Sequence, residues 1–355
     1  PESIMAVYKS YINGHNQVIL SVVPTKHKEF AVAPATFITP KRTLPKYDTT
    51  TETQLGYRQA PIDFDRSVMP KVATSVKAHM PSLYRVHFDN GAELLGTASI
   101  ETPTVQIEIN LPAGGRYVAK GKEGLADLTA AMMHEATQDS SLEQIQARLD
   151  KLGSVISIES GNYTTSISIS SLEKNLKETL SIVEEMLFKP AFHQKDFVRV
   201  KNQMLEGLVY QHQKPVWMAS QATRQVLFSG TVYERSSDGT EASVEGLTLD
   251  DVKDFYLKHY TPQGAQIVVV GDISPRQIKQ ELNFIEQWKG EPAPLLRPQV
   301  VKEKSQNTIY LVDKPGAPQS IVRMVRKGLP FEATGEGYLT ELAKLNLAGD
   351  LQSRF

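Results

Sequence analysis

Between residues 81 and 290 the sequence alternates repeatedly between two kinds of apolar periodicity, and this most constrains the fold. Runs such as "PTVQIEINLP" place an apolar residue at every second position, which is typical of a half-buried strand. Runs such as "LEKNLKETLSIVEEML" repeat apolar residues every three or four positions, as one face of a helix does. Strand pairs interleaved with helices pack as a sheet under a helical layer. The pattern predicts an α+β domain whose largely antiparallel sheet is covered by helices.

Turn and cap residues mark the boundaries of these elements. The dipeptide Asn90-Gly91 adopts the backbone of a tight hairpin turn at low cost, so a hairpin is expected there. Ser140 and Glu143 have capping-box spacing, which predicts a helix that begins there and ends at Gly153. The same reasoning predicts further helices at 172–187, at 194–212 and from Thr248, and a buried strand at 266–272.

The segments on either side of this domain have a different character. Residues 1–33 hold a short helical run and one strand-like run, "NQVILSVVP", which are expected to be the tail of a preceding domain. Residues 34–80 accumulate prolines and predict an extended linker. After a second proline-rich stretch, "TIYLVD" and "SIVRMVR" predict two strands, and a helix is expected from Leu339. The segment 291–355 therefore predicts the start of a further domain, and 81–290 the complete one.

Composition narrows the functional classes. Lys plus Arg number 39 against 40 Asp plus Glu, so no broad positive field favours nucleic acid. The absence of cysteine excludes disulfides, thiolate zinc sites and cysteine nucleophiles, but leaves the compartment open. No run approaches the roughly 18 apolar residues of a membrane span. Because the chain opens on Pro rather than Met, it is expected to come from a longer precursor, without any targeting segment.

A series of short sequence words, in order, resembles the insulinase and pitrilysin family of zinc metallopeptidases, which includes the mitochondrial processing peptidases. The words are "NGAELL", "GLA", "KPAF", "GTEASVEGLTLDDVKDFYLKHYTP", "IVVVGD", "IYLVDKPGAPQS" and "NLAGDLQSRF", and they span nearly the whole chain from about residue 80. The resemblance implies a peptidase-like α+β domain. Members have two similar halves that close round an unfolded peptide, and one half carries the zinc.

The resemblance also identifies where a zinc site would lie. In active members the helix after "GLA" carries His-x-x-Glu-His, whose histidines bind zinc and whose Glu activates the metal-bound water. The matching positions here are Asp127, Ala130 and Ala131, and the family's later Glu ligand matches Glu206. Arg199 lies seven residues before Glu206, where active members often have a second acid. A methyl group can neither bind zinc nor accept a proton, so the resemblance implies a degenerate site without metal or catalytic residue.

Two other readings of this region are weaker. His134 and Glu135 lie in the same helical run, but no second His completes a zinc pair, so they are expected to be a polar pair at a helix end. Asp127 and Glu206 together offer calcium or magnesium too few oxygen ligands. The sequence contains no Gly-x-Ser-x-Gly elbow, phosphate loop or dinucleotide turn.

These resemblances imply the non-catalytic, pseudo-peptidase half of an insulinase-type zinc metalloendopeptidase, inactive alone, that forms the chamber wall and binds substrate peptide opposite the zinc-bearing half. A structural or assembly subunit with no peptidase role is the alternative, and an active hydrolase with an unusual metal would need ligands that the sequence lacks. The expected partners are a catalytic half, from the same precursor or a paired subunit, and a peptide; exposed strand edges favour self-association. Zinc is expected only in the catalytic half. Bacterial two-half members are often exported, which favours the periplasm.

Overall fold

The computed structural model describes residues 2–14, 80–301, 306–329 and 334–348, together with a few isolated positions. The chain divides into two units, Pro1–Lys77 and Ala78–Phe355, which are described separately. The first unit contains the helix α1 (Glu2–Tyr11), none of whose residues is buried.

Several predicted segments lie outside the described residues. They are the strand at 18–23 and the linker at 34–80, apart from isolated positions, and the end of the terminal word "NLAGDLQSRF".

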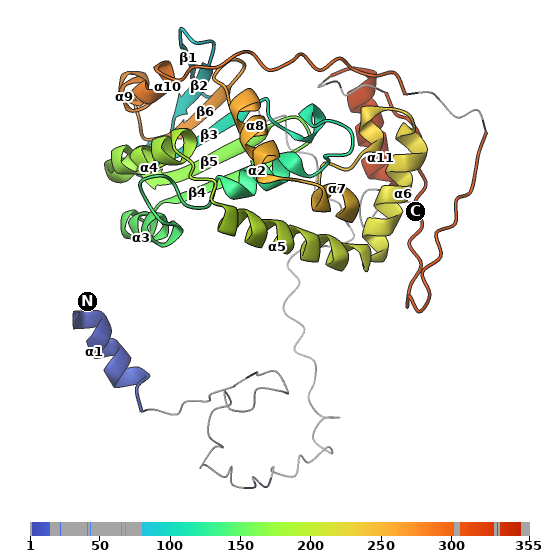
Figure 1. The fold of residues 1–355 in the computed structure, drawn as a ribbon, viewed down its shortest axis with the longest axis horizontal. Helices are drawn as coiled ribbons and strands as arrows, with labels where there is room; N and C mark the ends of the chain where they lie inside the picture. Colours follow the sequence, from blue (N-terminus) through green and yellow to red (C-terminus); the bar gives the residue numbers. More distant parts are fainter. Residues whose placement is uncertain are drawn as a thin grey trace. The chain divides into compact units, whose positions relative to one another are not determined.

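The second unit is built on one six-stranded sheet with the order β1-β2-β6-β3-β5-β4 (Figure 1). Four of the five neighbouring strand pairs are antiparallel, and only β2 and β6 run parallel. The prediction of a largely antiparallel α+β domain is therefore confirmed. The hairpin predicted at Asn90-Gly91 joins β1 to β2, with Gly91 at a φ of 88°. The strands are β1 (Leu83–His87), β2 (Glu93–Ala98), β3 (Thr104–Leu111), β4 (Val155–Ser160), β5 (Thr165–Leu172) and β6 (Gln266–Gly271).

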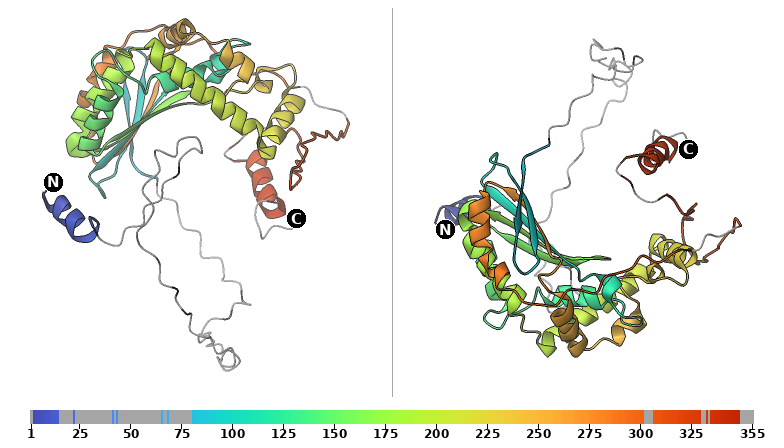
Figure 2. Two further views of the ribbon diagram at one scale, coloured as in Figure 1. Left: turned by 60° about the horizontal axis from the view of Figure 1, so that its bottom comes forward. Right: turned by 90° about the horizontal axis from the view of Figure 1, so that it is seen from above.

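Helices cover one face of this sheet (Figure 2). The helix α6 was not predicted, although Pro215 occupies its first turn, a position that proline favours. The described helices of the second unit are α2 (Leu125–Met132), α3 (Leu142–Leu152), α4 (Leu176–Phe188), α5 (Gln194–His212), α6 (Pro215–Phe228), α7 (Glu241–Glu245), α8 (Leu249–His259), α9 (Pro275–Glu281), α10 (Asn283–Glu286) and α11 (Glu336–Ala348). No described helix is long and apolar enough to cross a membrane.

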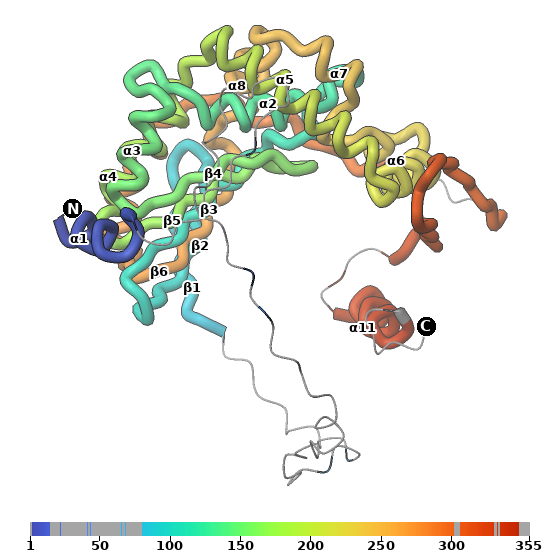
Figure 3. Tube along the Cα trace, turned by 90° about the horizontal axis from the view of Figure 1, so that it is seen from below, coloured from blue at the N-terminus to red at the C-terminus, as the bar shows by residue number. Residues whose placement is uncertain are grey.

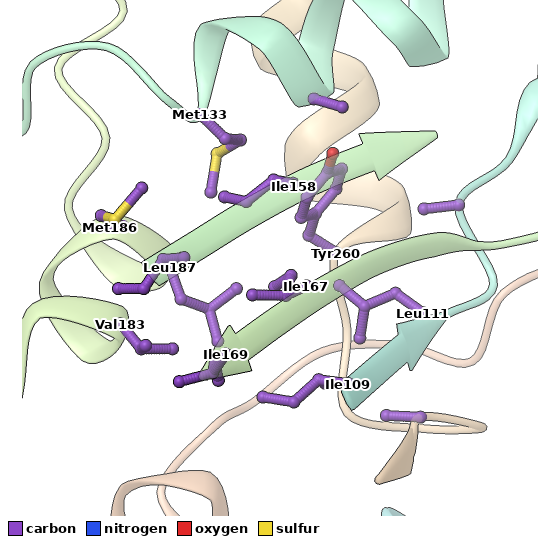
Figure 4. Close-up of a cluster of buried hydrophobic side chains, with 14 of the residues drawn as sticks. Ile109, Leu111, Met133, Ile158, Ile167, Ile169, Val183, Met186, Leu187 and Tyr260 are labelled. Carbon is purple, nitrogen blue, oxygen red and sulfur yellow. The ribbon is translucent and has the colours of Figure 1, made fainter. Parts of the chain in front are cut away.

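The core lies between the sheet and the helices that cover it, and α2, α3, α4, α5 and α8 contribute buried side chains to it. Every second side chain of β3, β4 and β5 points into the core. These side chains pack with residues of α4 and of the segments that follow α2 and α8 (Figure 4). The alternation that predicted the strands thus also places their apolar side chains in one layer. The labelled core residues are Ile109, Leu111, Met133, Ile158, Ile167, Ile169, Val183, Met186, Leu187 and Tyr260.

No helix of residues 80–301 covers the opposite face of the sheet, which we call the open face (Figure 3). The alternation that buries one set of side chains turns a polar set outward. Two side-chain hydrogen bonds link neighbouring strands there: Gln106 Nε2 donates to Ser170 Oγ at 2.7 Å, and Ser166 Oγ donates to Asn110 Oδ1 at 2.5 Å. The central polar residues of the open face are Gln106, Glu108, Asn110, Ser157, Ser166, Ser168 and Ser170.

The cap of α3 corrects the predicted helix start by one residue. Ser141, not Ser140, is the N-cap, and its capping box is completed by Gln144 rather than Glu143. Both registers are available in "SSLEQ", and the observed one places Ile145 and the rest of the apolar stripe in the core. Gly153 ends the helix with a φ of 62°, as predicted.

The two strands predicted within 306–329 do not form. "TIYLVD" and "SIVRMVR" have no regular structure, and Ile309 and Met324 are 97% and 95% exposed. A strand needs a neighbour to accept its backbone hydrogen bonds, and no described strand lies beside these segments. The helix predicted from Leu339 forms as α11.

Candidate functional site

At the start of α2, two glycines pack closely against neighbouring segments. Gly124, the N-cap of α2, has a φ of 96°, and a Cβ there would lie 2.9 Å from both Met204 of α5 and Val244 of α7. Gly239, with a φ of 84°, lies so close to the carbonyl group of Glu123 that a Cβ would overlap it. Glycine is required at both positions, and it holds the turn before α7 against the first turn of α2.

Polar contacts of Glu123 fasten the same turn. Arg235 Nη1 lies 3.0 Å from Glu123 Oε1, and the Ser243 hydroxyl donates to the Glu123 carbonyl at 2.9 Å. Asp238, between these anchors, is thereby brought beside α2.

Asp127 is the polar side chain that α2 presents to this junction. Burial raises its pKa, the negative charge of Asp238 adds to the rise, and the Ser160 hydroxyl opposes both, so that the pKa of Asp127 reaches about 7. Sequence analysis did not single out Asp238, although its position in "SSDGT", before a glycine of positive φ, indicates a turn. Asp127 therefore binds a proton readily near neutral pH.

Ala130 and Ala131 offer no ligand beside Asp127. Ala130 is 2% exposed, and its methyl belongs to the core, while Ala131 is half-buried at the margin of the core. Within the described residues, no group of three or more His, Cys, Asp or Glu side chains could hold a metal ion. The side chains at this junction therefore do not fit zinc.

Glu206 lies on α5, which packs antiparallel to α2. Met204 lies beside Gly124 at the start of α2, and Arg199 pairs with Glu135, beyond the end of α2, at 2.5 Å. Glu206 is two turns beyond Arg199 on the same side of α5, and its side chain is exposed. Among the described residues it makes no hydrogen bond or ion pair. The carboxylate that acts on Asp127 is Asp238, so the oxygen pair considered from sequence is not the one the structure indicates.

His134 and Glu135 lie just beyond the last residue of α2, and each contacts a different element. The backbone N–H of Ile158 in β4 donates to His134 Nε2 at 2.6 Å, while Glu135 pairs with Arg199 of α5. The interpretation of these residues as a polar pair at a helix end agrees with the structure. Sequence spacing could not predict their partners, which lie on elements far along the chain.

Two family profiles match successive parts of the chain. "Insulinase (Peptidase family M16)" matches residues 96–240, and "Peptidase M16 inactive domain" matches residues 246–355. Among curated proteins, the chain is 24% identical over 208 residues to the "Non-peptidase homolog YmxG" of Helicobacter pylori, a match that covers 58% of this chain and 48% of that protein. The chain thus matches about half the length of this relative.

Solved structures show the same fold. The peptidase M16 inactive domain from Pseudomonas fluorescens superimposes with a TM-score of 0.59 at 26% identity, over 62% of this chain and 54% of that one. The periplasmic protease PqqL from Escherichia coli superimposes with a TM-score of 0.57 at 20% identity, over 64% of this chain but only 26% of its own.

Proposed function

The chain belongs to the insulinase family of peptidases, with the fold of the family's inactive domain, and from this premise we propose that it is a pseudo-peptidase half that forms one wall of a peptide-binding chamber. The proposal has two parts: the chain does not cleave peptides, and it binds them. Ala130 and Ala131 remove the metal ligand and the base that the family's chemistry requires. What remains is a surface that can bind a peptide without cleaving it.

The proposal that the chain binds peptides rests on the open face of the sheet. It lies on the side of the sheet opposite the helical layer, and its β3 and β5 strands carry serine hydroxyls and amide groups, while Val268 and Val270 of β6 are exposed beside them. Such a surface offers both donors and acceptors to a peptide backbone.

The proposed partner is a catalytic half, from the same precursor or a paired subunit, which would hold zinc opposite the open face. Two observations support this partnership. The chain covers about a quarter of PqqL, and its own junction at Asp127 does not supply a zinc ligand set. The bacterial periplasm is proposed as the compartment.

A photo-crosslinking experiment tests whether the open face binds a peptide. Benzoylphenylalanine replaces Ser168, an exposed residue at the centre of the open face, and a labelled unfolded peptide is added before irradiation. We expect a covalent adduct. The matched control carries the same group at Glu178, an exposed residue of α4 in the helical layer, and should give little adduct.

Equal labelling from both positions, or none from Ser168 even with a catalytic half present, would favour the alternative of a structural subunit with no peptide-binding role. Metal analysis complements the experiment. About one zinc per chain, lost on Glu206→Ala, would overturn the non-catalytic assignment.

A further inference from the structure

Three arginines from distant parts of the sequence meet at residues 232–237, beyond the end of α6. Arg116 comes from the loop before α2, and its Nη1 atom donates to the carbonyl of Arg235 at 3.0 Å and also to that of Val232. Arg224 lies on α6 itself. Together, Arg116, Arg224 and Arg235 are called the arginine cluster below.

The side of α6 that faces this segment places Arg224 beside it. Gln221 Nε2 donates to Ser236 Oγ at 3.3 Å, and the Phe228 ring lies edge-on to the Tyr233 ring at a centroid distance of 6.0 Å. Arg224 lies between Gln221 and Phe228 in the sequence, at the spacing that puts all three on one side of a helix. Its guanidinium therefore lies beside the same segment.

Only one member of the arginine cluster is paired with a carboxylate. Arg235 Nη1 lies 3.0 Å from Glu123 Oε1, whereas the other two form no ion pair with any described residue. Glu234 and Asp238 are close in sequence, but their carboxylates accept hydrogen bonds from a backbone N–H and a serine hydroxyl of the same loop. The cluster thus retains two positive charges without a negative partner.

Two nitrogen atoms of these arginines are buried without a hydrogen-bond partner among the described residues, namely Arg116 Nε and Arg224 Nη1. A buried donor without a partner costs free energy, and a charged one costs more. Burial also lowers the pKa of the Arg116 guanidinium. The charges of Arg224 and Arg235 lower it further, against the opposing effect of Tyr163 and Tyr233. A bound anion would offset both costs.

We propose that the arginine cluster binds a phosphate group, and that Arg116 Nε and Arg224 Nη1 donate hydrogen bonds to its oxygen atoms. Guanidinium groups present planar N–H donors that suit phosphate oxygens. A phosphate ester carries nearly two negative charges at neutral pH, which matches the two unpaired arginines better than a single carboxylate does. Both side chains are partly exposed, so a small ligand can reach them from solvent. The site is independent of the peptide-binding function proposed above.

Calorimetric titration of the full chain with inorganic phosphate, in chloride buffers of constant ionic strength, tests the site. We expect saturable binding and a loss of affinity of about tenfold or more in Arg224→Gln, which removes the charge and keeps a polar side chain. Arg116 is left intact because it also holds residues 232–237. The matched control is Arg276→Gln, at an exposed position of α9, and it should bind as the wild type does.

No saturable binding by the wild type, or equal affinity in Arg224→Gln, would overturn the site. Urea unfolding then separates a ligand site from a structural role. In phosphate-free buffer Arg224→Gln should be at least as stable as the wild type, because it removes a buried donor that has no partner. Phosphate should stabilise the wild type more than the variant, since a ligand of the folded chain raises its stability. Equal stabilisation would indicate a general salt effect and would contradict the proposal.

Other anions identify the source of the phosphate group. Binding of inorganic phosphate but not of glycerol phosphate would indicate free phosphate as the ligand, and binding of both would indicate the phosphate group of a small ester. Acetate should bind at least about tenfold more weakly than either, because it carries one charge. Acetate that binds as tightly as phosphate would replace the phosphate group by a carboxylate and overturn the assignment.

Discussion

Two side chains, the buried His259 and the partly buried Asp127, favour their neutral forms for the same physical reason. Each is withdrawn from water, and desolvation penalises the charged form of an acid and of a base alike. For Asp127 the pKa rises to about 7, and for His259 it falls to about 4. The His259 ring lies against Tyr117 and Phe255 at centroid distances of 5.4 and 4.5 Å, so its surroundings are aromatic rather than polar.

Asp127→Asn should remove a pH dependence of stability. The folded-state pKa of Asp127 lies above its unfolded value of 3.8, so its stabilising effect is complete below 3.8 and is lost as pH rises through about 7. Between about pH 5 and pH 8 the wild type should lose on the order of 3 kcal/mol at this residue, and Asp127→Asn none of it. Urea unfolding at both pH values measures this. If the stability of Asp127→Asn changes with pH as that of the wild type does, the raised pKa of Asp127 is contradicted. Asp238→Asn should show a pH dependence of stability between those of the wild type and Asp127→Asn.

His259→Phe should stabilise the chain in acid. The folded-state pKa of His259 lies below its unfolded value of 6.5, so its contribution is complete above 6.5 and is lost as pH falls toward about 4. At about pH 5 the wild type should be weakened by about 2 kcal/mol relative to its own value at about pH 8, and the variant should not. Comparing each protein with itself across pH removes the effect of the larger ring on packing.

At the scale of elements, α2, α5 and the turn before α7 are closely packed at two glycines. Gly124 and Gly239 both have positive φ and both lack room for a methyl group. Ser243 and Arg235 then hold Glu123 between them.

Gly239→Ala should lower the free energy of unfolding by more than the strain of its positive φ alone would. A Cβ would overlap the Glu123 carbonyl, and we expect a loss of about 3 kcal/mol or more. Gly230→Ala is the matched control, because Gly230 has a similar φ of 77° but open space around it, and should cost only about 1–2 kcal/mol. Equal losses in chemical denaturation would show that the close approach at Gly239 has no energetic consequence.

Restoring the family's ligands should create zinc affinity. The variant Asp127→His, Ala130→Glu, Ala131→His places two imidazoles on one side of α2, and Glu206 on α5 is expected to complete the set. Because Ala130 is 2% exposed, the new carboxylate should also destabilise the metal-free chain. Calorimetric titration with zinc measures the affinity, and adding Glu206→Ala should reduce it. Zinc binding that ignores Glu206 would show that this residue is not the matching ligand.

At the scale of the whole molecule, residues 306–329 expose apolar side chains that the described elements do not cover. Ile309, Leu311 and Met324 are each more than 90% exposed. Burial of such side chains is favourable by roughly 1.5–3 kcal/mol each, so they favour contact with another surface. The proposed catalytic partner is one candidate for that surface.

The chain should therefore self-associate through this segment. We expect light scattering to show species larger than the monomer at high concentration, and the variant Ile309→Ser, Leu311→Ser, Met324→Ser to shift the distribution toward the monomer. Expression of a complete two-half precursor should also remove the association. A strictly monomeric wild-type chain at high concentration would contradict the expectation that this surface lacks a partner.

The sequence by itself determined most of the elements between residues 81 and 290, because their signals are local. Alternation in "TVQIEINL" predicted β3, the capping residue Thr248 predicted the start of α8, and Asn90-Gly91 predicted the β1-β2 turn. The position expected for a degenerate site rests on the "GLA" word and on the spacing to Glu206, and it stays a prediction. Ala130 and Ala131 have no side-chain group that binds a metal or accepts a proton, and this follows from the sequence alone.

Only the tertiary structure decided which distant residues meet, since such contacts leave no local pattern. The negative charge of Asp238 raises the pKa of Asp127, and His134 accepts a hydrogen bond from Ile158, because separate elements pack at the start and end of α2. The same dependence explains the wrong prediction of strands within 306–329. These segments are rich in β-branched and other apolar residues, but a strand forms only where a neighbour accepts its backbone hydrogen bonds, and that neighbour is a property of the fold rather than of the segment.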